Sequence, residues 1–106
     1  MKPQGADVMT GPLKRVVTVT NPQGLHIRPA AAFAELASRF ESKVTVSKSE
    51  EAVDGKFWPS LLMLAAERGT DLLLEVEGRD APDALDALAA LLSSVFEEAP
   101  PVDPTG

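Results

Sequence analysis

The apolar residues of the chain show two periodicities, an alternation typical of strands and a spacing of three or four residues typical of helices. The alternating segments predict strands over residues 14–20, 43–47, 49–53 and 71–77. The two middle strands are close enough in sequence to form a hairpin. The helical spacing predicts helices over residues 27–40, between Phe57 and Gly69, and from Asp80 onward.

Each predicted element has an apolar face that we assign to the core. In the strands these residues are Val17, Val19, Val44, Val46, Leu72, Leu74 and Val76. In the long helices they are Ala30, Phe33, Ala34, Ala37, Phe40, Leu85, Leu88, Leu91, Leu92, Val95 and Phe96. The short helix is apolar on more than one side. Leu61, Leu64 and Ala65 fit the core, and Trp58, Leu62 and Met63 fit an exposed apolar patch, although Trp58 fits the core equally well.

The order strand, helix, strand, strand, short helix, strand, long helix predicts the fold class. One-sided helices and alternating strands fit an α+β domain, an open-faced βαββαβα sandwich in which helices cover one face of a four-stranded antiparallel sheet. We expect this domain to cover residues 13–98. Residues 1–12 read as a flexible N-terminal lead, and residues 99–106, with three prolines, as a disordered C-terminal tail.

Composition narrows the possible partners. Sixteen acidic and ten basic residues give a net charge of −6, which disfavours nucleic acid or an anionic membrane as a partner. With no cysteine and one histidine, neither a disulfide nor a metal site is expected. The N-terminus has no apolar leader, and no run of about 18 apolar residues occurs. We therefore expect a cytoplasmic protein that does not insert into membranes.

The single histidine, His26, falls where the first strand gives way to the first long helix. Gly24 can adopt the positive φ of a sharp reversal, and Pro29 is tolerated in the first helical turn. His26 is therefore expected near the helix N-cap. The N–H groups of Ile27 and Arg28 should point outward there, and the helix dipole adds about half a positive charge, so the position suits an anion.

These features give His26 a candidate chemistry. The positive helix end disfavours imidazolium, so a neutral ring would keep a nucleophilic nitrogen. The guanidinium of Arg28 could donate a charge-assisted hydrogen bond to an oxyanion beside the ring. Together they suit phosphoryl transfer to nitrogen. The alternative is an ordinary surface or capping histidine.

The segment Gly24-Leu25-His26-x-Arg28-Pro29-Ala30 resembles the active-site signature of HPr, the histidine-containing phosphocarrier of the phosphoenolpyruvate-dependent sugar phosphotransferase system. Three other segments are similar to that family: Val53-Asp54-Gly55-Lys56, Arg68-Gly69-Thr70 and Gly78-Arg79-Asp80-Ala81. The order of predicted elements also matches its βαββαβα sandwich.

The resemblance implies a role for each matching residue. His26 would accept a phosphoryl group on Nδ1 from phosphorylated enzyme I and pass it to a IIA-type acceptor. Arg28 would steady the phosphate, assisted by the backbone amides of Ile27 and Arg28. Such a protein is a carrier with a covalent phosphohistidine intermediate rather than an independent enzyme, and it needs no cofactor. We expect it to act as a monomer.

The partner surface and its regulation are expected to differ from those of many relatives. We expect contacts from Ala30, Ala31, Trp58, Pro59, Leu62 and Met63. In relatives with a regulatory kinase, a serine follows the lysine of the Gly-Lys segment, whereas this chain has Phe57, so no such switch is expected there. Ser60 lies nearby but fits an ordinary helix-start residue. The first helix carries Glu35 where the family usually presents lysines, leaving Arg39 as a basic contact.

Two alternatives to a role in sugar uptake stay open. The first keeps the phosphoryl chemistry but serves a regulatory phosphorelay. The second is a binding module that keeps the fold without being phosphorylated on His26.

Overall fold

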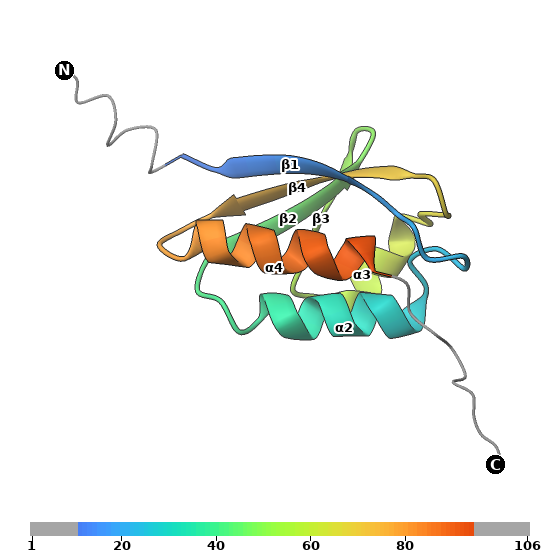
Figure 1. The fold of residues 1–106 in the computed structure, drawn as a ribbon, viewed down its shortest axis with the longest axis horizontal. Coiled ribbons are helices and arrows are strands. Elements are labelled where there is room, and N and C mark those ends of the chain that lie inside the picture. The colour runs from blue at the N-terminus through green and yellow to red at the C-terminus, as the bar shows by residue number, and fades with distance from the viewer. Residues whose placement is uncertain (1–10, 95–106) are drawn as a thin grey trace, which may run out of the picture.

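A computed structural model of the chain describes residues 11–94. The strands are β1 (Leu13–Thr18), β2 (Lys43–Lys48), β3 (Glu51–Asp54) and β4 (Asp71–Glu77). The helices are α2 (Ile27–Ala37), α3 (Trp58–Met63) and α4 (Ala81–Ser93). The strands form one antiparallel sheet in the order β1-β4-β2-β3, with the helices on one of its faces (Figure 1). The predicted fold class is confirmed.

The core lies between the sheet and the two long helices. Leu72, Leu74 and Val76 point inward from the central strand β4, and each is fully buried. The register sets Val17 of β1 opposite Leu72 and Val46 of β2 opposite Leu74, so apolar rows run across the inner face. These predicted core positions are confirmed, and β4 has the predicted bounds.

Helix α2 has the expected buried stripe but ends at Ala37, three residues earlier than Phe40. Ser38 is the C-cap, and both its N–H and its hydroxyl donate to the carbonyl oxygen of Ala34, at 3.0 and 2.8 Å. Both bonds satisfy one carbonyl group of the last turn, and the chain then leaves the helix. Phe40 still packs against the core, but from the following turn.

Helix α3 covers residues 58–63 only, so the prediction of a helix reaching toward Gly69 is wrong. Leu64 is its C-cap, and Ala65 has a φ of +51°, in the left-handed region that ends a right-handed helix. Leu61 and Leu64 are buried as predicted. Ala65 is exposed, contrary to prediction, and Ala66 is buried in its place.

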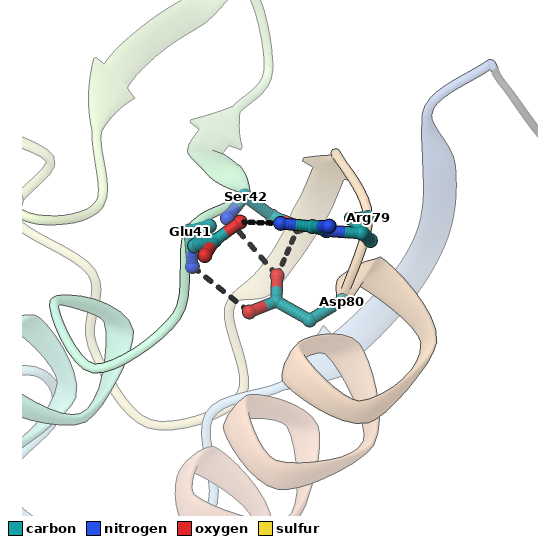
Figure 2. Close-up of polar contacts among 4 residues, drawn as sticks. All are labelled: Glu41, Ser42, Arg79 and Asp80. Atoms are coloured by element: carbon teal, nitrogen blue, oxygen red, sulfur yellow. Dashed lines mark hydrogen bonds and ion pairs between the residues drawn. The ribbon is translucent and has the colours of Figure 1, made fainter.

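Asp80 is the N-cap residue of α4, but its side chain does not cap that helix as predicted. The carboxylate instead accepts hydrogen bonds from the N–H groups of Glu41 and Ser42, at 2.9 and 3.0 Å, and from the Ser42 hydroxyl (Figure 2). Arg79 also forms an ion pair with Glu41 at 3.1 Å (Figure 2). These contacts, here called the Asp80 clamp, join the start of α4 to the loop after α2.

Helix α4 buries Leu85, Leu88 and Leu92 as predicted, and Leu91 packs at the edge of the core. The predicted core residues Val95 and Phe96 lie outside the described residues, as do most of the predicted N-terminal lead and all of the C-terminal tail. Within residues 11–94, no helix is both long enough and apolar enough to cross a bilayer.

The Asp80 clamp predicts a pH-dependent contribution to stability. The Ser42 hydroxyl and the Glu41 and Ser42 N–H groups lower the pKa of Asp80 below its ordinary value of 3.8. Because a lowered pKa stabilises the folded state only while the group is ionised, the contribution is complete above about pH 4 and is lost as the pH falls through the lowered pKa. Asp80→Asn should therefore lower the thermal unfolding midpoint at pH 7 and change it progressively less below pH 4.

The matched control is Asp83→Asn, which removes an exposed carboxylate from the first turn of the same helix. Thermal unfolding followed by circular dichroism from pH 7 to pH 2 measures both variants. An Asp80→Asn effect no larger than that of the control, or one that is independent of pH, would contradict the clamp.

Candidate functional site at the start of helix α2

His26 is the N-cap residue of α2, as the sequence predicted. Its backbone is extended, with φ −90° and ψ −168°, and its carbonyl oxygen accepts the N–H of Ala30 at 2.9 Å. The imidazole makes no capping hydrogen bond to the helix. The ring is thus placed at the helix start without being used to build the helix.

The loop before His26 is held by hydrogen bonds on two sides. On one side, the N–H of Gly24 donates to the carbonyl oxygen of Asn21 at 2.9 Å, and the buried Asn21 side chain donates back to the carbonyl oxygen of Gly24 at 3.0 Å. On the other, the N–H of Leu25 donates to the carbonyl oxygen of Ala66 at 2.9 Å. Gly24 has a φ of +75°, the reversal predicted for it. These bonds fix the chain immediately before His26.

The two ring nitrogens of His26 have different environments. The side chain as a whole is half-buried, and Nε2 has less than 1 Å² of exposed surface. A group delivered by another protein cannot reach an enclosed atom. Nε2 is therefore the ring nitrogen that the protein encloses.

The first turn of α2 is suited to negative charge. Pro29 has no N–H, and the first hydrogen bond along the helix is the one from Ala30 to His26, so the amides of Ile27 and Arg28 precede it. The Arg28 side chain is exposed, and the first turn holds no acidic residue. Amide dipoles and a guanidinium thus favour an anion beside the histidine.

Exposed apolar side chains gather on α2 and α3, which pack against each other. Ile27, Phe57, Trp58 and Met63 are 61%, 57%, 43% and 71% exposed. Pro59 and Leu62 are half-buried beside them. We call these six residues the apolar surface. It confirms the predicted exposure of Trp58 and Met63.

The structure buries one of the predicted contact residues and exposes two apolar side chains that were not predicted to be exposed. Ala30 has no exposed surface because it packs into the core, so its side chain cannot touch a partner, whereas Ala31 is half-buried. The sequence analysis did not assign the side chains of Ile27 and Phe57 to this surface. Both are large apolar residues directly at a helix start, where the core-facing stripe has not yet begun, and that signal could have identified them.

Ser60 behaves as the sequence indicated, whereas Arg39, expected as a basic contact to a partner, pairs with a residue of this chain. The Ser60 hydroxyl lies 2.7 Å from the carbonyl oxygen of Phe57 and 2.9 Å from that of Asp54, so it serves the start of α3. Arg39 lies 3.6 Å from Glu35 one turn earlier on α2, and both side chains are exposed. The positive charge expected from Arg39, which lies just after α2, is therefore offset by a carboxylate of that helix.

Comparison with known proteins agrees with this site. A family model described as "PTS HPr component phosphorylation site" matches residues 13–94. The chain is 41% identical over 86 residues to phosphocarrier protein HPr of Neisseria meningitidis, covering 81% of this chain and 97% of that one. It is 40% identical over 87 residues to phosphocarrier protein NPr of Shewanella violacea, covering 82% and 96%. The crystal structure of HPr from Bacillus anthracis superposes with a TM-score of 0.74 at 34% identity, covering 76% and 96%.

An open-faced sandwich with a histidine at the start of its first helix is the form of a phosphocarrier domain, and the relatives carry that name. The chain belongs to the HPr family of the phosphotransferase system. The resemblance predicted from the residues around His26, and the phosphocarrier function that it implied, are confirmed.

The geometry before His26 predicts the effect of adding a methyl group at Gly24. A Cβ there would lie 2.5 Å from the Ala66 carbonyl oxygen and 3.0 Å from the Cα of Glu67, at a positive φ. Gly24→Ala should lower the free energy of unfolding by about 2 to 4 kcal/mol and displace the loop. Gly69→Ala is the control, because Gly69 also has a positive φ, +91°, but nothing lies within 4 Å of its Cβ position.

Urea unfolding measures both glycine variants, and the shift of the His26 ring resonances in NMR spectra measures the displacement. We expect a smaller loss for Gly69→Ala, about 1 to 2 kcal/mol, with His26 unmoved. Equal losses, or unchanged His26 resonances in Gly24→Ala, would contradict the close contact with Ala66.

Proposed function

We propose that His26 carries the phosphoryl group. In this scheme Nδ1 attacks the phosphorus of phosphorylated enzyme I, and the Nδ1–P bond forms as the bond to the donor breaks. The reverse exchange then passes the group to a IIA-type acceptor. The observation that carries the proposal is the placement of His26 at the start of α2 with Nε2 enclosed, which favours Nδ1 over Nε2 for the reaction.

The surroundings of His26 supply charge rather than covalent chemistry. The attacking nitrogen must be unprotonated, and the amide dipoles at the start of α2 favour the negative charge of the phosphoryl group. Once the phosphoryl group is bound, its oxygens lie near the amides of Ile27 and Arg28 and within reach of the Arg28 guanidinium. A carrier must also release the group, and a half-exposed site allows the next protein to reach it.

The apolar surface beside His26 is the proposed docking site for both partners. Trp58 and Met63 offer the large exposed contact area expected of an interface anchor, and Ile27 directly follows the histidine. The Glu35–Arg39 pair contributes little net charge to α2. Association should therefore rest more on apolar contact than on a basic helix face.

Sugar uptake is the proposed output, with a regulatory phosphorelay as the alternative that uses the same chemistry. The identities to HPr of Neisseria meningitidis and NPr of Shewanella violacea, 41% and 40%, favour neither output. The two outputs are distinguished by capturing partners from a lysate with the phosphorylated protein. A sugar permease would indicate sugar uptake, and a separate regulatory IIA protein would indicate the phosphorelay.

We further propose a cytoplasmic monomer, whose mass in solution is measurable by light scattering.

The central role of His26 predicts a clear result by mass spectrometry. Incubation of the protein with phosphoenolpyruvate and enzyme I should add one phosphoryl group, about 80 Da, that is lost in acid. His26→Ala should remain unmodified, while Arg28→Ala should still be modified but at least about tenfold more slowly, because a charge-assisted contact is lost. An acid-stable product, or modification of His26→Ala, would contradict the assignment. No modification of the wild type would favour the inert binding module.

The apolar surface predicts which substitutions weaken docking. Trp58→Ala and Met63→Ala should each raise the KM of enzyme I for the carrier by about tenfold with little change in kcat, because interface anchors are worth about 1 to 2 kcal/mol or more. Val16→Ala is the matched control, since Val16 is 62% exposed but lies on β1. Initial rates at varied carrier concentration give both constants. A similar rise in KM for Val16→Ala would contradict a localised docking site.

A further inference from the structure

The turn that follows α3 has a conformation that its own sequence does not favour. Ala65 has a φ of +51°, where a side chain with a Cβ is strained, and it is exposed, so no burial of its methyl group compensates. Its N–H donates to the carbonyl oxygen of Leu62 at 3.1 Å, which is a local bond of the helix end. A contact from elsewhere in the fold is needed to favour this conformation over others.

Lys48, the last residue of β2, supplies that contact. Its ammonium nitrogen lies 3.0 Å from the carbonyl oxygen of Leu64 and 3.3 Å from that of Ala65. Lys48 is half-buried, and both bonds are assisted by its charge. The ammonium group thus holds the carbonyl groups of the peptides that enter and leave the strained residue, so Lys48 favours the observed turn.

The next residue connects this turn to the site. The carbonyl oxygen of Ala66 accepts the N–H of Leu25 at 2.9 Å, and Leu25 directly precedes His26. Gly24 also lies against this carbonyl group, on the side where any other residue would carry its Cβ atom. The position of the Ala66 carbonyl therefore fixes the position of the backbone from which His26 extends.

We infer that Lys48 is a positioning residue for phosphoryl transfer, acting on His26 through the strained turn at Ala65 and the bond from Leu25 to Ala66. This inference rests on the proposed role of His26. Lys48 acts through the backbone of residues 64–66. Loss of its ammonium should let the turn relax, shift the Leu25 backbone, and misplace the imidazole relative to a docked phosphoryl donor.

Four variants test this inference. Lys48→Met keeps most of the aliphatic stem and removes the charge, and Lys48→Arg keeps a charged donor. Ala65→Gly removes the strain, because glycine adopts a positive φ without penalty, and the double variant Lys48→Met with Ala65→Gly tests whether the turn then holds without the lysine. Lys43→Met, on an exposed lysine at the other end of β2, is the control.

We expect Lys48→Met to lower the kcat of phosphoryl transfer from enzyme I by about fivefold to tenfold. The KM of enzyme I for this variant should stay within about twofold of that for the wild type. Lys48→Arg should recover most of the rate, and so should Ala65→Gly added to Lys48→Met. The His26 ring resonances of the unphosphorylated protein should move in Lys48→Met, should return toward wild type in the double variant, and should not move in Lys43→Met.

Wild-type kcat and unmoved His26 resonances in Lys48→Met would overturn the inference. So would an equal loss in Lys43→Met, or a double variant no better than Lys48→Met. The NMR comparison needs no phosphoryl donor, so it separates this inference from the proposed function. If the wild type accepted no phosphoryl group but the resonances moved as expected, the chemistry assigned to His26 would fail, while the effect of Lys48 on the position of His26 would stand.

Discussion

The hydrogen bond from the N–H of Leu25 to the carbonyl oxygen of Ala66 is the contact on which the site depends most. It joins the loop before α2 to the turn after α3, two segments that are far apart in the sequence. A histidine at the end of a glycine-containing loop would otherwise sample many positions. With this bond and the paired contacts between Asn21 and Gly24, the backbone of His26 has one position at the start of α2. The chemistry of the carrier follows from that placement.

The two ends of α2 are fixed by different physical means. At the start, backbone hydrogen bonds and a close glycine contact hold the loop that leads to His26 and Arg28. At the far end, the Asp80 clamp ties the following loop to α4 with a carboxylate (Figure 2). Between them, α2 runs beside α4 on the same side of the sheet (Figure 1), and its buried stripe belongs to the core. The charged groups that give stability are thus separated from those proposed to handle phosphate.

Much of this architecture could be predicted from periodicity. Strand β4 alternates between buried leucine or valine and residues that are partly or fully exposed, and its bounds agree with the structure because one face is buried and the other is not. The N-cap position of His26 followed from Gly24 and Pro29, which restrict the backbone locally. Where local chemistry alone decides the conformation, the sequence was sufficient.

The remaining features depend on contacts between distant residues. Ala65 and Ala66 favour a helix by propensity. Their carbonyl groups instead accept hydrogen bonds from outside the helix, that of Ala65 from Lys48 and that of Ala66 from Leu25. Asp80 is a residue type that commonly caps helices, but its carboxylate instead accepts hydrogen bonds from Glu41 and Ser42 in the loop after α2. Ala30 fitted both the core and the partner surface, and packing placed it in the core. Local patterns carry no information on such choices.

The central claim is that the enclosure of one ring nitrogen directs phosphoryl transfer to the other. Long-range proton–nitrogen NMR of the protein labelled with ¹⁵N and phosphorylated by enzyme I measures this most directly, because the nitrogen bound to phosphorus shows a coupling to it. The account predicts that the coupling appears on Nδ1 of His26. A coupling on Nε2, or phosphorus bound to any other residue, would contradict it.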